Sequence, residues 1–161
     1  MLLWFAGMSF VAVWAVFKDP AFDHRLVIVG ALLPDVIDVW TGGRWVAHTV
    51  LFSVALLTVV MLGTRGRRLL RRQLIALPIG TLLHLVLDGM WADKQVFWWP
   101  VYGTSFGNRP LPSIERGWLD VPLELLGLVA LVWVWRRFRL AEPERRRYFL
   151  ATGRVGRDLV S

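Results

Sequence analysis

Long apolar runs that alternate with blocks of arginine are the feature that most restricts how this chain folds. The arginines gather at residues 65–72 and 136–147, and each block follows a hydrophobic run. Runs of this kind suit helices in hydrocarbon, because a helix satisfies its backbone hydrogen bonds internally. The pattern therefore predicts an all-α, polytopic membrane helix bundle.

The composition supports the same class. Of the 161 residues, 56% are hydrophobic and ten are tryptophan, and the mean hydropathy is +0.51, which is too apolar for an ordinary soluble domain of this size. The chain contains no cysteine, so any bound metal ion must be held by nitrogen and oxygen atoms. The formal charge of +7 lies in the arginine blocks beside apolar runs, which favours a membrane lipid surface over nucleic acid as partner.

The apolar runs predict four or five helices. The first run, residues 2–17, has no basic segment before it, so we expect a retained helix rather than a cleaved signal peptide. Within a later run, Pro78 and Gly80 predict a kink rather than an end, since membrane helices tolerate both residues. The three long runs after the second are residues 46–63, 73–92 and 118–135.

The second run, residues 26–40, is expected to be a broken or re-entrant segment. Pro34 lacks a backbone donor and biases Leu33 away from helical geometry. Asp35 and Asp38 follow it three residues apart, and so share a face of any helical turn that begins at Pro34. A segment that crosses fully gives five spans and an external N-terminus, whereas one that dips and returns gives four spans and a cytoplasmic N-terminus.

The arginine blocks also predict the orientation. Under the positive-inside rule both blocks are cytoplasmic, so we expect a membrane bundle over residues 1–137 and a basic cytoplasmic tail over residues 138–161. In either topology, four separate segments bring ionisable side chains to the external ends of their helices: Asp35, Asp38, His48, His84, Asp88, Asp120 and Glu124.

These side chains predict a metal site. Ionisable groups are costly inside a bilayer and are usually functional there, and His84 and Asp88 stand one helical turn apart in an apolar run. Two histidines with two or more aspartates suit a divalent ion that activates water, with zinc as first choice and manganese or iron as alternatives. We expect Asp38 or Glu124 to act as general base. The predicted ligands are Asp35, Asp38, His48, His84 and Asp88.

Four sequence elements together resemble a known family. They are GALLPDVID at 30–38, AHT at 47–49 with Ser53, GTLLHLVLD at 80–88, and Trp99-Pro100. This PDxxD, H and HxxxD order resembles the predicted membrane-bound metal-dependent hydrolases of bacteria, over roughly residues 24–135. The resemblance implies a helix bundle in the bacterial inner membrane, with metal ligands at the five residues given above.

One departure from the family is visible. Members commonly carry a histidine in the first helix, and residues 1–17 contain none. Either the site has one ligand fewer, or His24 takes the place of the missing one.

Three functions are compatible with this sequence. The first is a hydrolase that acts at the external membrane interface on a lipid or lipid-linked ester or phosphoester. The second is a proton- or ion-coupled transporter, which would place its His and Asp near the midplane with access from both sides. The third is a non-catalytic membrane protein whose metal or salt-bridge cluster ties helices together. The one-sided distribution of ionisable groups favours the hydrolase.

Overall fold

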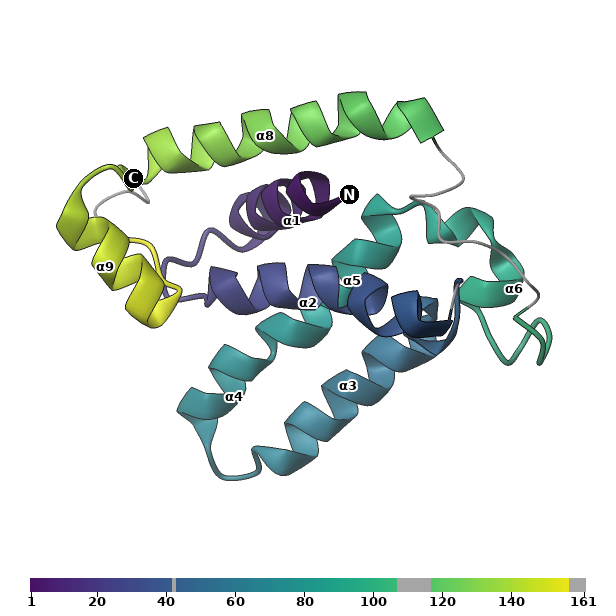
Figure 1. Cartoon of the computed structure of the whole chain (residues 1–161). Helices are drawn as coiled ribbons and strands as arrows, with labels where there is room; N and C mark the ends of the chain where they lie inside the picture. The colour runs from purple at the N-terminus through teal and green to yellow at the C-terminus, as the bar shows by residue number, and fades with distance from the viewer. Residues whose placement is uncertain (42, 107–116, 157–161) are drawn as a thin grey trace.

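The structure is a computed structural model that describes residues 1–41, 43–106 and 117–156, and these residues form helices and turns without any strand. Five helical segments run along the molecule in alternating directions (Figure 1). They are α1 (Leu2–Phe17), α2 (His24–Asp38), α3 (Val50–Gly63), α4 (Arg68–Leu74) continued by α5 (Ala76–Leu87), and α8 (Asp120–Arg137).

Shorter elements connect and follow these segments. The connection after α5 contains α6 (Lys94–Phe97), and α9 (Pro143–Thr152) follows α8. Single 3₁₀ turns lie at Val39–Thr41, Val46–His48, Met90–Ala92 and Gly117–Leu119. By length and composition, two described segments could cross a membrane, Arg68–Leu87 and Gly117–Arg137.

The break expected in the second run is not found. α2 is one continuous helix with Pro34 inside it, so the segment is not broken at Pro34. Pro34 has no hydrogen to donate to the Gly30 carbonyl, but this removes one hydrogen bond without ending the helix. The N-terminus of α2 is capped by the Asp23 carboxylate, which accepts from the backbone N–H groups of Arg25 and Leu26.

The fourth segment is interrupted at Ile75, between α4 and α5. Pro78 lies three residues later and cannot donate to the carbonyl of Leu74, the last residue of α4. The helical bonding resumes when the N–H of Ile79 donates to the carbonyl of Ile75 at 3.3 Å. Pro78 therefore accounts for an interruption one turn before its own position.

Glycines allow two pairs of helices to approach closely. A Cβ added at Gly80 of α5 would lie 2.3 Å from the Val27 carbonyl oxygen of α2, and one at Gly30 would lie 2.3 Å from the Leu77 carbonyl oxygen. A Cβ at Gly7 of α1 would lie 2.4 Å from the Gly127 carbonyl oxygen of α8. Small residues at such contacts are typical of helices that pack within membranes.

Polar side chains lie inside the molecule, and many apolar ones lie outside. Val129 on α8 is 64% exposed and Val59 on α3 is 66% exposed. This distribution is the reverse of the one expected for a water-soluble bundle. The buried polar residues are Ser9, Asp23, His24, Asp38, His48, Thr49, Ser53, Thr64, Thr81, His84 and Asp88.

The arginine-bearing ends of the segments gather at one end of the bundle. The Arg72 guanidinium of α4 donates to the Asp19 carboxylate, between α1 and α2, at 2.6 Å. Burial raises the pKa of Asp19, but the hydrogen bonds from Arg72 and from the Ala21 N–H, together with the Arg72 charge, outweigh it, so the pKa lies below its ordinary value. At the same end, the Arg25 guanidinium donates to the Leu150 carbonyl oxygen of α9.

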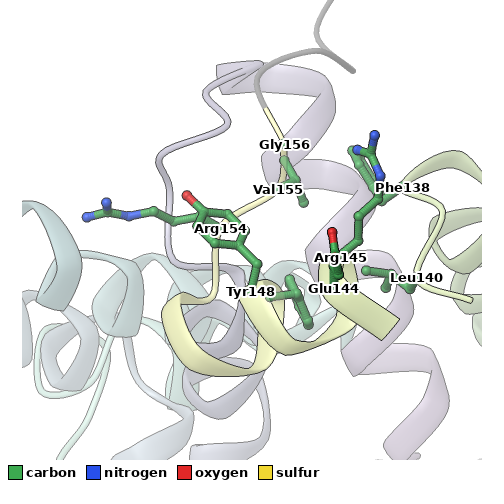
Figure 2. Close-up of a pocket in the computed structure, with 9 residues that line it drawn as sticks. Phe138, Leu140, Glu144, Arg145, Tyr148, Arg154, Val155 and Gly156 are labelled. Atoms are coloured by element: carbon green, nitrogen blue, oxygen red, sulfur yellow. The ribbon is translucent and has the colours of Figure 1, made fainter. Parts of the chain in front are cut away.

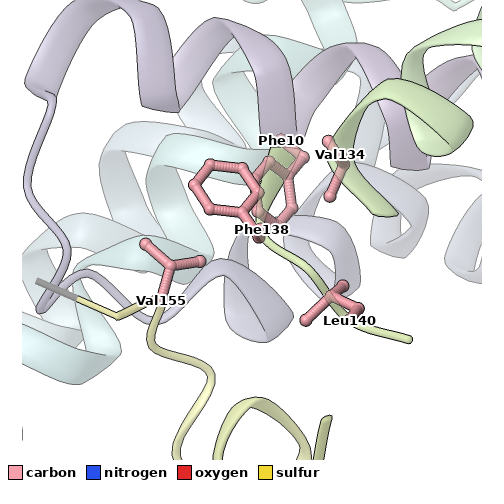
Figure 3. Packing of buried hydrophobic residues seen from close by; sticks show 5 residues of the cluster. All are labelled: Phe10, Val134, Phe138, Leu140 and Val155. Carbon is pink, nitrogen blue, oxygen red and sulfur yellow. The ribbon is translucent and has the colours of Figure 1, made fainter. Parts of the chain in front are cut away.

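The described residues after α8 pack against the arginine-bearing end of the bundle. The backbone N–H of His24 donates to the Gly153 carbonyl at 2.9 Å, and that of Val155 donates to the Pro20 carbonyl at 3.2 Å. Side chains from α1, α8 and the residues after α8 form one hydrophobic cluster there (Figure 3): Phe10, Val134, Phe138, Leu140 and Val155.

A cavity of about 220 Å³ lies beside this cluster, between α9 and the end of α8 (Figure 2). Because α8 ends here, the cavity is at the arginine-bearing end of the bundle. It is lined by Phe138, Leu140, Glu144, Arg145, Tyr148, Phe149, Arg154, Val155 and Gly156.

The close contact at Gly80 leads us to predict that a side chain at this position destabilises the bundle. Replacing Gly80 with alanine should lower the free energy of unfolding by about 1–3 kcal/mol, because the new methyl group meets the rigid backbone of α2. Gly63→Ala is the matched control, since a Cβ at Gly63 meets nothing within 4 Å. Denaturant unfolding in detergent micelles measures both, and equal stability of the two variants would contradict the packing described.

Candidate metal centre

Three side chains from different elements converge at the end of the bundle opposite the arginines. The Nε2 atoms of His48 and His84 lie 3.3 Å apart. Asp35 Oδ1 lies 3.5 Å from His48 Nε2 and 3.6 Å from His84 Nε2. One atom from each residue thus belongs to a group that could hold a metal ion, with all three within 4.8 Å of one another.

The local fold explains how these side chains meet. Asp35 lies in the last turn of α2, and His84 lies in the last turn of α5. His48 ends the 3₁₀ turn before α3, and the next residue, Thr49, caps α3 by accepting the Phe52 N–H on its hydroxyl. α2 and α5 run antiparallel to α3. The C-terminal ends of α2 and α5 therefore lie beside the N-terminal end of α3.

Each histidine is oriented through its Nδ1 atom. His48 Nδ1 donates to Asp38 Oδ2 at 2.6 Å, and His84 Nδ1 donates to the Ala31 carbonyl oxygen at 2.7 Å. A carbonyl oxygen can only accept, and so can an ionised carboxylate, so both hydrogens are assigned to Nδ1. The lone pairs of both Nε2 atoms then face Asp35, in the arrangement that metal-ligating histidines usually adopt.

The distances fit a small divalent ion. Zinc with tetrahedral bonds of about 2.0–2.2 Å to nitrogen and oxygen requires ligand atoms about 3.3–3.6 Å apart, and the three measured separations are 3.3, 3.5 and 3.6 Å. Asp35 Oδ1 is also buried without a hydrogen-bond partner among the described residues. A metal ion between these three atoms would satisfy all of them, and a proton on one Nε2 atom would satisfy them in part.

The centre is buried, and Asp35 is its one partly exposed member. The side chains of His48 and His84 are fully buried, whereas that of Asp35 is 24% exposed. The Phe5 ring of α1 lies over the His84 ring, with centroids 4.2 Å apart. The side chain of Asp35 therefore reaches the surface, while Phe5 covers the His84 ring.

Asp38 is placed behind His48 and outside the group of three. Its carboxylate is fully buried and also accepts the backbone N–H groups of Trp45 at 2.8 Å and Ala47 at 3.4 Å. These contacts make Asp38 an orienting group for His48. Its predicted roles as a direct ligand and as general base stay predictions.

The other predicted residues lie outside the group of three as well. Asp88 is buried at the C-cap of α5, where its N–H donates to the His84 carbonyl at 2.8 Å. Glu124 accepts the Leu3 N–H at 2.8 Å, and so joins α8 to the beginning of α1. The ligand role of Asp88 and the catalytic role of Glu124 remain untested predictions.

His24 does not supply a further ligand. It begins α2, eleven residues before Asp35, which is about 16 Å along a helix. Its ring stacks on Phe10 at a centroid distance of 4.3 Å, and its Nδ1 lies 3.0 Å from the Phe22 carbonyl oxygen. Of the two alternatives left by the sequence, the structure favours a centre with one ligand fewer.

Some groups that contact the histidines of the centre could not be predicted from the sequence. The Ala31 carbonyl that holds His84 has no side-chain signature, and the place of Phe5 over that ring depends on how α1 packs. Arg44 forms an ion pair with Asp93 at 3.2 Å, across two connecting segments.

Comparison with protein-family models, with curated proteins and with solved structures yields no match. The family resemblance of the motifs therefore gains no support from these comparisons. The observation that supports a metal site is the group formed by Asp35, His48 and His84, which could hold a metal ion.

Metal binding by this group can be measured directly. Purified protein should bind zinc stoichiometrically, and His48→Gln and His84→Gln should each lose it, because each removes one of three ligands. Asp38→Asn should weaken zinc affinity by about 10- to 100-fold, as loss of an orienting partner does.

His24→Gln is the matched control, since it also replaces a fully buried histidine of this bundle. It should keep the full zinc content in elemental analysis and equilibrium dialysis. Full zinc retention by either His48→Gln or His84→Gln would exclude that histidine from the centre.

Proposed function

We propose that this chain is an integral membrane hydrolase that uses a divalent metal ion, zinc in the first instance, to cleave an ester or phosphoester bond of a lipid or lipid-linked substrate. The convergence of two histidine Nε2 atoms on the Asp35 carboxylate, at 3.3–3.6 Å, carries this proposal. The two Nδ1 hydrogen bonds support it, because they turn both nitrogen lone pairs toward that carboxylate.

The residues of the centre suit hydrolysis. Three protein ligands are typical of catalytic zinc sites, which keep a further position for water or substrate, whereas structural sites usually have four. An ion held there would lower the pKa of its bound water toward neutrality. Asp38 keeps the His48 ring in place, and the partly exposed Asp35 lies where a substrate would enter.

The distribution of side chains supports a membrane location. Apolar side chains are exposed along α3 and α8, while polar ones are buried, as expected where hydrocarbon surrounds a bundle. The arginine blocks lie at one end, and the metal centre lies at the other. If all five alternating segments cross the membrane and the arginines are cytoplasmic, the centre faces the exterior of the bacterial inner membrane.

The position of the centre favours the hydrolase over a transporter. Asp35 and His84 lie in the last turns of their helices, and His48 lies before the first turn of α3. A transporter requires its binding groups near the midplane with access to both sides. A group at one end of the bundle is better suited to chemistry at a membrane surface.

Turnover in the presence of a chelator tests the proposal. Zinc-loaded protein in mild detergent should hydrolyse long-chain carboxylic esters or phosphoesters, and a chelator should abolish the activity until zinc is restored. Asp35→Asn should reduce kcat/KM by on the order of 100-fold or more, because it weakens the charge that holds the ion.

Asp19→Asn is the control, because Asp19 lies at the arginine end and pairs with Arg72. Its activity should equal that of the parent. Turnover that survives both the chelator and Asp35→Asn would refute metal-dependent hydrolysis, and chelator-insensitive ion flux in liposomes would favour the transporter.

A further inference from the structure

Three arginines of α4 surround a hollow of about 770 Å³. They are Arg68, Arg71 and Arg72, and Leu69 completes the lining. The arginines stand at positions i, i+3 and i+4, and therefore on one face of the helix. α4 lies at the end of the bundle that also carries α9 (Figure 1). This arginine hollow is thus separate from the metal centre, and its wall is rich in guanidinium groups.

The arginine hollow has a shortage of carboxylates around it. Residues 39–87 contain no Asp or Glu. Arg72 donates to Asp19 at 2.6 Å, whereas the guanidinium groups of Arg68 and Arg71 have no hydrogen-bond or ion-pair partner among the described residues. Like charges one helical turn apart repel each other. An anion bound in the hollow would relieve this repulsion.

Exposed leucines lie beside these charges. Leu69 is 79% exposed although it belongs to the lining, and Leu62, in the last turn of α3, is 58% exposed. The exposed apolar surface of α3 therefore continues up to the arginine block. A soluble phosphate compound has no group to place against these leucines, whereas a phospholipid carries a phosphate and acyl chains in one molecule.

The charge of the hollow also selects among phospholipids. A zwitterionic headgroup carries an ammonium group, which needs a carboxylate near its phosphate, and residues 39–87 supply none. A headgroup with a net negative charge needs only the guanidinium groups, whose N–H donors match phosphate oxygens in pairs. Basic pockets at the cytoplasmic side of membrane helices attract such anionic headgroups.

We propose that Arg68, Arg71 and Arg72 bind the headgroup phosphate of one anionic phospholipid, whose acyl region lies against Leu69. Arg72 contributes while it keeps its bond to Asp19, and Arg68 and Arg71 supply the unpaired charges. This proposal rests on the membrane location proposed above and is independent of metal-dependent hydrolysis.

Native mass spectrometry of the purified protein in detergent micelles tests the site by counting bound lipids. Phosphatidylglycerol should bind with saturation at one lipid for each chain, and phosphatidylcholine should bind more weakly. Glycerophosphoglycerol, the same headgroup without acyl chains, should fail to displace the lipid at equal concentration. Displacement at equal concentration would show a site for a soluble phosphoester and would overturn the lipid assignment.

Two double variants with the same loss of charge make the result specific. Arg68→Gln with Arg71→Gln should raise the Kd for phosphatidylglycerol on the order of 10- to 30-fold. Arg146→Gln with Arg147→Gln is the matched control, because both residues are exposed on α9 and lie outside the hollow. The control should bind like the parent. Equal weakening by the two pairs, or no weakening by the first, would overturn the proposal.

Extraction of membranes with alkaline carbonate separates this proposal from the location on which it rests. The parent and both double variants should stay in the membrane pellet. Retention in the pellet without any difference in lipid binding between the variants would reject the lipid site alone. Release of the parent into the supernatant would reject the membrane location and the lipid site together.

Discussion

Two hydrogen bonds to the Nδ1 atoms of His48 and His84 orient the group that could hold a metal ion. By donating Nδ1–H to Asp38 and to the Ala31 carbonyl, His48 and His84 turn their Nε2 lone pairs toward each other and toward Asp35. When both Nε2 atoms are unprotonated, this arrangement brings three electron-rich atoms together in a buried place. The same geometry is favourable around a divalent ion, and this is why metal binding is the central proposal.

The helix packing makes this geometry possible. Ala31 and Asp35 lie on α2, and His84 lies on α5, so the centre requires these two helices to be in close contact. Gly30 and Gly80 allow that contact, because any side chain at either position would meet the backbone of the other helix. The packing of the bundle and the chemistry of its centre therefore depend on the same pair of helices.

Much of this was predictable from the sequence, because apolar runs and charge blocks act locally. The first run, residues 2–17, is α1 without any shift, and three of the five predicted ligands meet in one group. The break at Pro34 was wrong, since one missing hydrogen bond is a smaller effect than the packing of α2 on α5. Spacing could not distinguish Asp35 from Asp38, because both follow Pro34 on one helical turn, and only tertiary contacts assign the second to His48.

X-ray absorption at the zinc edge of the metal-loaded protein would show the ligands of the ion itself. The arrangement described here predicts a shell with two imidazole nitrogens at about 2.0–2.1 Å and carboxylate or water oxygens at about 2.0–2.2 Å. The imidazole scattering should decrease by half in any zinc retained by His84→Gln. A shell of oxygen atoms alone, without imidazole scattering, would show that zinc binds elsewhere and would contradict the centre.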